Sequence, residues 1–136
     1  MFTRRQLIQA LGSSAALGAL YPLTAQAQVD QVKVYFGFPP GSSGDTVARR
    51  VAEKWAGTPF SKNAGIVENK PGAGGRIALE ALKSASADGS VLAVTPASMM
   101  VVYPHIYRKL AYNPFEDISP VSLGCRFEFS VMPRDE

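Results

Sequence analysis

Three short loops in this sequence contain the residue types that bind an anion through backbone amides and hydroxyl groups. Residues 39–44 hold two glycines and two serines, residues 69–75 hold three glycines, and residues 95–98 hold a threonine and a serine. Each loop precedes a pattern typical of a helix. The N–H groups that begin a helix are unpaired and carry partial positive charge, so they bind carboxylate or phosphate without a lysine. The loops therefore predict an anion site built mainly from backbone donors.

The same composition is typical of ordinary turns between a strand and a helix, and the pattern alone leaves this alternative open. Gly41 and Gly44 suit a tight turn, because glycine adopts backbone conformations that other residues avoid. Ser43 or Asp45 can cap the helix that follows.

Motifs for other chemistries are missing or incomplete. Residues 40–45 lack the Lys-Ser/Thr pair of a Walker loop, and residues 72–75 do not continue as G-x-G-x-x-G. His105 is the single histidine of the chain, and no serine stands in a G-x-S-x-G elbow. The sequence thus favours no catalytic residue, no metal site and no cofactor.

The loops are positioned by a strand–loop–helix pattern that occurs three times. Strands are predicted over residues 32–38, 65–68 and 91–95, and helices over residues 45–55 and 76–85, with a short helical stretch over residues 99–102. The continuous apolar run of residues 91–95 predicts a strand buried on both faces. This βαβ pattern indicates a parallel sheet with flanking helices, which places all three loops at one edge.

The predicted apolar faces of the two helices follow helical spacing. They comprise Val47, Ala48, Val51, Ala52 and Trp55 in the first helix, and Ile77, Ala78, Ala81, Leu82 and Ala85 in the second.

After Tyr103 the pattern becomes irregular. A turn is predicted at residues 112–115, an extended segment at residues 118–123 and a strand at residues 127–131. Cys125 is the single cysteine, which excludes an internal disulfide, and we expect it to be a small buried residue. No element follows to close the sheet, so we expect an incomplete domain.

The N-terminus has the order of regions found in a secretory signal. Arg4 and Arg5 precede an apolar stretch, and Ala25-Gln26-Ala27 is an A-x-A cleavage site, so residues 1–27 are predicted to be removed and the remainder exported to the periplasm. The paired arginines resemble a twin-arginine signal, with an ordinary secretory signal as the alternative. A retained membrane anchor is the other alternative, although the apolar stretch is short for a membrane span.

Composition limits the remaining classes of function. The 136 residues suit a single domain, and 46% of them are hydrophobic, which argues against extended disorder. The net charge of +3 includes both leader arginines. Without them, the chain has twelve basic and eleven acidic residues, a net charge of +1. Since no basic stripe is present, we expect no nucleic-acid partner, and no stable membrane insertion after cleavage.

Several segments together resemble a known family. They are residues 38–45 (FPPGSSGD) with Ala48-Arg49, residues 67–75 (VENKPGAGG), Ala87-Asp88-Gly89 before a strand, residues 112–117 (YNPFED) and residues 119–122 (SPVS). In this order and spacing they resemble the extracytoplasmic solute receptors of the tripartite tricarboxylate transporter family, the Bug-type substrate-binding proteins. Gly41-Ser42 stands where the family often has Gly-Gly, and Ala87-Asp88-Gly89-Ser90 where it has Pro-Asp-Gly-Tyr.

The resemblance implies an α/β, periplasmic-binding-protein-like (type II) lobe. Because members are longer than this chain, it implies a truncated receptor, with residues 28–124 as the first lobe and residues 125–136 as the start of a crossover into a missing second lobe. Its implied function is capture of a small carboxylate, an organic acid or acidic amino acid, for a tripartite tricarboxylate-type transporter. The ligand-binding residues it implies are Pro40, Gly41, Ser42, Ser43, Gly44, Asp45, Thr95, Ala97 and Ser98, together with Gly74 and Gly75.

Two alternatives remain. An α/β hydrolase-like enzyme would have to work from Ser42, Ser98 or His105, and no general base is placed beside a nucleophile. A periplasmic sensor lobe would use the same ligand site and would have a membrane sensor kinase as its partner instead of the membrane subunits of a transporter.

Overall fold

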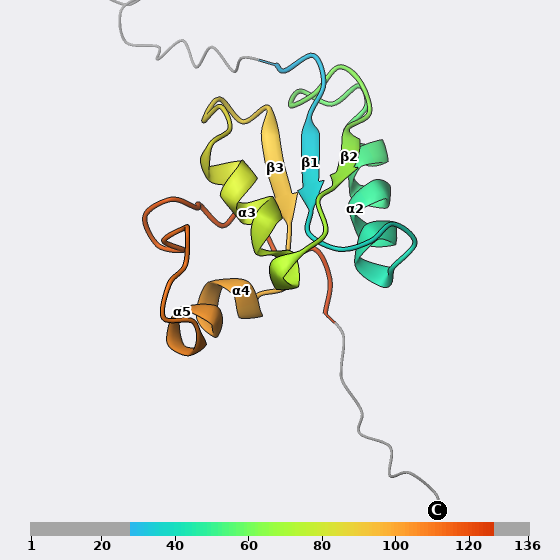
Figure 1. Cartoon of the computed structure of the whole chain (residues 1–136). Coiled ribbons are helices and arrows are strands. Elements are labelled where there is room, and N and C mark those ends of the chain that lie inside the picture. The colour runs from blue at the N-terminus through green and yellow to red at the C-terminus, as the bar shows by residue number, and fades with distance from the viewer. Residues whose placement is uncertain (1–27, 127–136) are drawn as a thin grey trace, which may run out of the picture.

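Three parallel strands form the centre of the molecule in the computed structural model, which describes residues 28–126. The strands are β1 (Lys33–Phe36), β2 (Ile66–Asn69) and β3 (Val91–Val94), in the order β2-β1-β3. Both neighbours pair with β1 in parallel, so that Lys33 lies opposite Ile66 on one side and Val91 on the other. The predicted parallel sheet is therefore confirmed, and the C-terminal ends of all three strands lie at one edge (Figure 1).

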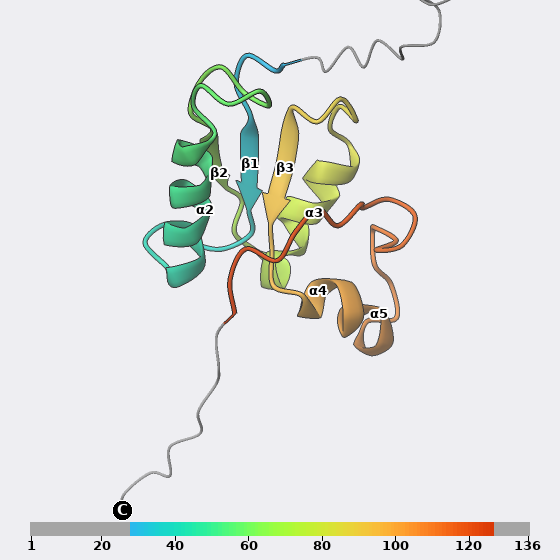
Figure 2. The same ribbon diagram turned by 180° about the vertical axis from the view of Figure 1, so that it is seen from behind.

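The helices cover the two faces of this sheet. Helix α2 (Ser43–Lys54) joins β1 to β2 and packs on both of them, whereas α3 (Arg76–Lys83) joins β2 to β3 and packs on β1 and β3. Figures 1 and 2 show α3 on one face of the sheet and α2 on the other. This arrangement follows from two right-handed crossovers that run in opposite directions across the sheet, the first from β1 to β2 and the second from β2 past β1 to β3.

Two apolar clusters form the core. Under α2, Val32 just before β1 and Val34 within β1 pack on Ala48 and Ala52. All four side chains are fully buried. The second cluster consists of Leu79, Met99 and Tyr112.

The first helix begins earlier than its pattern predicts. Ser42 is the N-cap, because its Oγ accepts a hydrogen bond from the Asp45 N–H at 3.3 Å. The expectation that Ser43 or Asp45 caps this helix is therefore wrong, since both lie within its first turn.

Helix α3 is rotated relative to its predicted apolar face. Leu79 is buried, although the predicted face omits it, and Ile77 is 43% exposed. The short helix buries Ala78 and Leu79 because they face the second cluster, where Met99 and Tyr112 supply apolar partners from later in the chain.

The prediction that residues 91–95 are buried on both faces is wrong. Every residue of β3 is only partly buried, and β3 lies at the edge of the described sheet, whereas β1 occupies the centre. Parallel order places the first strand between its two successors, and a continuous apolar run does not by itself reveal which strand is central.

The chain beyond β3 forms the short helices α4 (Ser98–Val101) and α5 (Tyr103–Ile106) and then a turn before residue 118. Residues 118–126 form no strand; they pass the ends of β3 and β1 and reach α2 (Figure 2). Cys125 is exposed, so the expectation of a buried cysteine is wrong; residues 119–126 are all exposed. The predicted strand at residues 127–131 and the N-terminal leader lie outside the described residues.

Between residues 28 and 126, no helix is long and apolar enough to cross a membrane.

Candidate functional site

The predicted loops lie at the carboxyl edge of the sheet, where the strand order reverses. β1 is followed by the crossover to β2 on one side, whereas β3 lies on its other side and is followed by α4 and α5. Figure 1 shows α4 and α5 on the far side of β3 from α2. In open α/β sheets, ligands bind in the crevice at such a switch point. The loops after β1 and β3 therefore flank the switch point of this sheet.

The first loop, residues 39–44, runs into the start of α2, which provides backbone donors. Four N–H groups at a helix start lack intrahelical partners, and here the side chain of Ser42 satisfies the one on Asp45. Within residues 28–126, no acceptor is hydrogen-bonded to the N–H groups of Ser42, Ser43 or Gly44. These amides lie within the first turn, where the helix dipole favours negative charge.

Gly41 differs from the amides that follow it. Its N–H donates to Asp45 Oδ2 at 2.9 Å, so it is already paired. Its φ of +83° favours glycine, and a β-carbon at this position would meet no atom within 4 Å. The glycine is therefore needed for the turn itself, and the space beside it is open.

The second loop is held by its own carbonyl groups. Residues 72–75 all have positive φ, including Ala73 at 48°. The carbonyl of Gly72 accepts from Gly75 N–H at 2.8 Å, and that of Gly74 accepts from the Tyr103 hydroxyl at 3.1 Å. These hydrogen bonds fix the loop against α5.

Gly75 is buried where the loops meet. A β-carbon on Gly75 would collide with Met99 Cε and lie 3.2 Å from the Phe38 ring, while a β-carbon on Gly37 would lie 2.6 Å from Gly75. The loops therefore share one edge, and Phe38 and Met99 fill the space around Gly75.

The third loop contributes less than its sequence indicates. Helix α4 is a single turn without a side-chain cap, so its dipole is weak. The hydroxyl of Thr95 donates to Met99 Sδ, whereas Ala97 is exposed and Ser98 is partly exposed. Ser98 is thus the hydroxyl that this loop can offer to a ligand.

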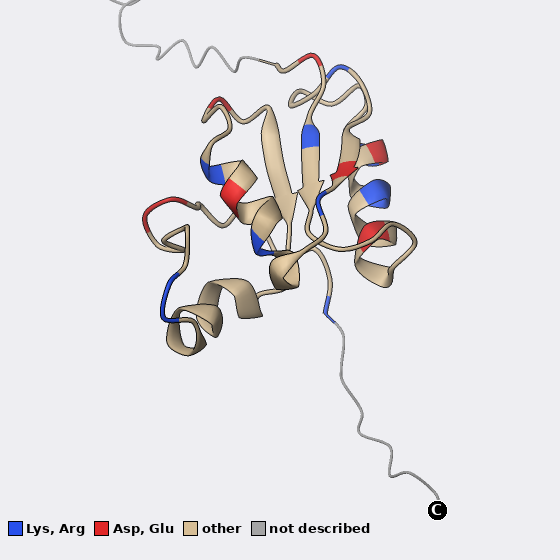
Figure 3. Cartoon of the chain, in the orientation of Figure 1, with Lys and Arg blue, Asp and Glu red and all other residues tan. Residues whose placement is uncertain are grey.

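Charged side chains are sparse at this edge. Figure 3 shows the loop before α2, η1 (Ala73–Gly75) and α4 without charged residues. Arg76 begins α3, where its Nε donates to the Ala73 carbonyl at 2.8 Å and its guanidinium lies 4.1 Å from the centre of the Tyr107 ring. The edge therefore presents mostly neutral donors.

Asp45, a predicted ligand residue, is engaged within the protein. It is 3% exposed, and hydrogen bonds from Arg49, Gly41 and Asn69 lower its pKa to about 2. The sequence motifs include Asp45, Arg49 and Asn69 but do not connect them, because Asn69 is 24 residues from Asp45 and lies in β2 rather than in α2.

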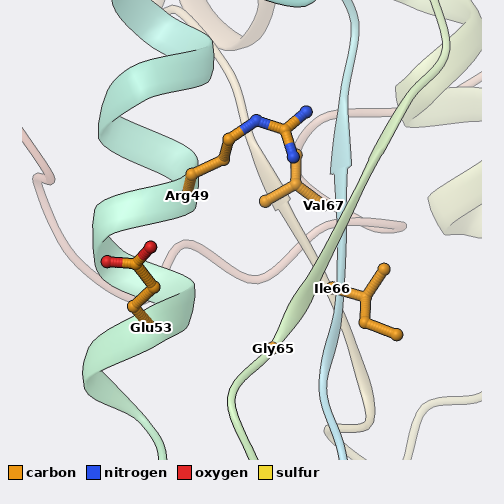
Figure 4. Close-up of a pocket in the computed structure, with 5 residues that line it drawn as sticks. All are labelled: Arg49, Glu53, Gly65, Ile66 and Val67. Carbon is orange, nitrogen blue, oxygen red and sulfur yellow. The ribbon is translucent and has the colours of Figure 1, made fainter.

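Two hollows lie along α2, and none of the predicted ligand residues lines them. One, of about 280 Å³, is lined by Arg49, Glu53, Gly65, Ile66 and Val67. Figure 4 shows Arg49 extending over Val67, with Ile66 projecting from the other side of the strand. A second, of about 590 Å³, lies between α2 and Gly124.

The described residues show no pairing of His105 with a serine of the kind that the enzyme alternative needs. His105 is exposed on α5, and among the described residues no hydrogen bond joins its imidazole to Ser42 or Ser98. The hydroxyl of Ser42 instead caps α2.

The doubly wound parallel sheet defines an α/β lobe of the periplasmic-binding-protein class. A solved structure described as a periplasmic transporter superimposes on 74% of this chain with a TM-score of 0.61 and 31% identity, which covers 32% of that protein. Residues 47–135 match the family described as tripartite tricarboxylate transporter family receptor. The chain belongs to this receptor family.

Curated relatives agree with this assignment. A UPF0065 protein of Cupriavidus necator is 33% identical over 97% of this chain and 42% of its own length. A UPF0065 protein of Bordetella bronchiseptica is 35% identical over 85% of this chain and 36% of its own length, and BugT of Bordetella pertussis is 31% identical over 80% and 33%. The chain thus spans less than half the length of these relatives.

Proposed function

We propose that this chain supplies the first lobe of a periplasmic receptor that captures a small carboxylate, an organic acid or acidic amino acid, for a tripartite tricarboxylate-type transporter. The observation that carries the proposal is the set of three amides, on Ser42, Ser43 and Gly44, that have no hydrogen-bond acceptor within residues 28–126 and that lie at the topological switch point. The switch point is where open α/β sheets bind ligands.

The proposed contacts follow from this geometry. The three amides and the Ser43 hydroxyl donate to the ligand carboxylate, and the Ser98 hydroxyl approaches from the opposite loop. The remaining proposed residues, which shape the crevice around these donors, are Pro40, Gly41, Gly74, Gly75, Thr95 and Ala97. Asp45 belongs to the site because its carboxylate accepts the hydrogen bond from Gly41 N–H.

Neutral donors suit a receptor because it must also release its ligand. A carboxylate at a helix start is stabilised by about 0.3–1 kcal/mol through the dipole, and each hydrogen bond to a charged group adds about 1.5–3 kcal/mol before the costs of binding. Binding by this lobe alone is therefore expected to be weak and reversible.

Export is the second part of the proposal. Residues 1–27 are proposed to be a signal, so the exported protein begins at Gln28, and residues 28–124 form the lobe. Mass spectrometry of periplasmic protein tests the cleavage site, and an Arg4→Lys/Arg5→Lys variant tests the twin-arginine route. Full-length protein retained in the membrane contradicts this part of the proposal.

Isothermal titration of the purified chain tests ligand capture. Acetate, succinate and glutamate are compared with acetamide, a neutral molecule of the shape of acetate. Saturable binding of at least one carboxylate without binding of acetamide is expected. Equal responses to acetate and acetamide, or no response to any carboxylate, would contradict the proposal.

The alternatives differ in measurable ways. An ester hydrolase would turn over a simple ester through His105. A sensor lobe would use the same ligand site and differ in its membrane partner.

A further inference from the structure

Asp45 accepts hydrogen bonds at every available position of its carboxylate. Oδ2 accepts from Gly41 N–H at 2.9 Å and from Arg49 Nε at 2.9 Å. Oδ1 accepts from Arg49 Nη2 at 3.1 Å and from Asn69 Nδ2 at 2.8 Å. An ionised carboxylate has about four acceptor sites. Because all of them are used and the side chain is buried, Asp45 has no oxygen lone pair left for a ligand.

Asn69 forms hydrogen bonds with both Asp45 and Arg49. Its Oδ1 accepts from Arg49 Nη2 at 2.9 Å, and its Nδ2 donates to the Phe38 carbonyl at 3.1 Å as well as to Asp45. The three side chains therefore join four parts of the fold: Phe38 just after β1, the first loop, α2 and the last residue of β2.

The first loop has few other attachments. Pro39 and Pro40 are exposed, and Gly41 has open space beside it. Within the described part of the chain, the hydrogen bonds of residues 39–42 run only to Asp45 and Thr46 in the first turn of α2. The loop's position relative to β2 thus depends on Asn69.

We propose that Asp45, Arg49 and Asn69 form a positioning triad that fixes the three unpaired amides of the first loop in the orientation that binds a carboxylate. This inference rests on the proposed function and assigns its three residues a role without ligand contact. Fixing donors before the ligand arrives reduces the entropy lost on binding. The bidentate geometry requires arginine, since lysine cannot supply two donors in a fixed plane.

Nitrogen-15 NMR of the full chain tests the triad, with sodium succinate as the probe. Asp45→Asn and Asn69→Ala are compared with wild type and with Lys83→Gln. The last variant removes a 2.8 Å ion pair with Asp117 that lies away from the first loop. Asn69→Ala leaves the Asp45–Arg49 pair in place, so it provides a second test if Asp45→Asn fails to fold.

The two triad variants are expected to weaken succinate binding at least about tenfold, because displaced donors lose their alignment. The Gly41 amide, whose hydrogen bond to Asp45 ties the first loop to the triad, is expected to exchange with solvent faster. Lys83→Gln is expected to change affinity by less than about twofold, as exposed ion pairs contribute little. Unchanged succinate affinity in a folded triad variant overturns the inference, and so does an equal loss in Lys83→Gln.

A double variant separates positioning from independent structural effects. If Asp45 and Arg49 act as one unit, Asp45→Asn/Arg49→Gln binds succinate no more weakly than the weaker single variant. Multiplied losses overturn the inference. If wild type binds no succinate, carboxylate capture fails, and amide exchange alone decides the triad: unchanged exchange in Asn69→Ala overturns it, and faster exchange confined to the first loop supports it.

Discussion

Gly44 packs directly against the ring of Phe36, so closely that a β-carbon on Gly44 would lie 2.6 Å from Phe36 Cζ. Phe36 is the last residue of β1 and is 3% exposed, so its ring has little room to move. This contact sets how near the start of α2 comes to the carboxyl edge. Gly44 is therefore required for its small size, whereas Gly41 is required for its positive φ.

Gly44→Ala is expected to lower the free energy of unfolding by about 1–3 kcal/mol, because overpacking forces buried neighbours to shift. Urea unfolding measures this. Gly124→Ala is the matched control, since its β-carbon would meet only Val47 Cγ1 at 4.0 Å. Adding Phe36→Leu should recover part of the loss; full additivity of the two changes would contradict the packing argument.

Acid should weaken the fold through Asp45. Its pKa is about 2 in the folded protein, against the ordinary 3.8, mainly through hydrogen bonds from Arg49, Gly41 and Asn69. A lowered folded pKa stabilises the fold above the unfolded pKa of about 4, and this contribution disappears as the pH falls through about 2. Unfolding in urea between pH 5 and pH 2 should therefore show a smaller loss of stability in Asp45→Asn than in wild type.

Asp117→Asn is the control for this pH dependence. Its pKa is also lowered, by Asn113 N–H and Lys83, so this variant should remove a separate part of the acid loss. Identical pH profiles of stability for wild type and Asp45→Asn would contradict the assignment of part of the acid loss to Asp45.

Tyr112→Phe tests the second apolar cluster. The Tyr112 hydroxyl donates to the Met99 carbonyl at 2.8 Å in a buried position. Its loss should cost about 1 kcal/mol and leave carboxylate affinity unchanged. Thermal unfolding and the succinate titration measure these two quantities. A stability equal to that of wild type would show that this hydrogen bond contributes nothing.

His105→Ala tests the enzyme alternative. His105 is exposed, and it is expected to be dispensable for binding. Wild type and variant should show the same succinate affinity and no hydrolysis of p-nitrophenyl acetate above the buffer rate. Hydrolysis by wild type that the variant lacks would favour an enzyme.

Local patterns predicted the strands, the helices and the edge they share, because alternation, helical spacing and glycine-rich breaks are encoded over a few residues. They failed where contacts between residues far apart in the sequence determine burial or strand order. Leu79 is buried by Met99 and Tyr112, which come later in the chain, and β3 is an edge strand because of the order in which the strands pair.

The candidate site was predictable to a similar extent. The helix start and its hydroxyls follow from the loop sequence. The role of Asp45 in α2 does not, because its partner Asn69 lies 24 residues further along the chain, in β2. The N-cap at Ser42 had a local signal, since Ser42 and Asp45 have the S-x-x-acid spacing related to a capping box.

Removal of a single backbone donor tests the central claim most directly. Ser43 is the first residue of α2, where proline is tolerated, and Ser42 has the extended conformation (φ −72°, ψ 162°) that a following proline requires. Ser43→Pro therefore deletes one N–H, and Ser43→Ala deletes only the hydroxyl. The account predicts that Ser43→Pro keeps its melting temperature and binds succinate about tenfold more weakly than Ser43→Ala. Equal succinate affinities in the two variants would contradict it.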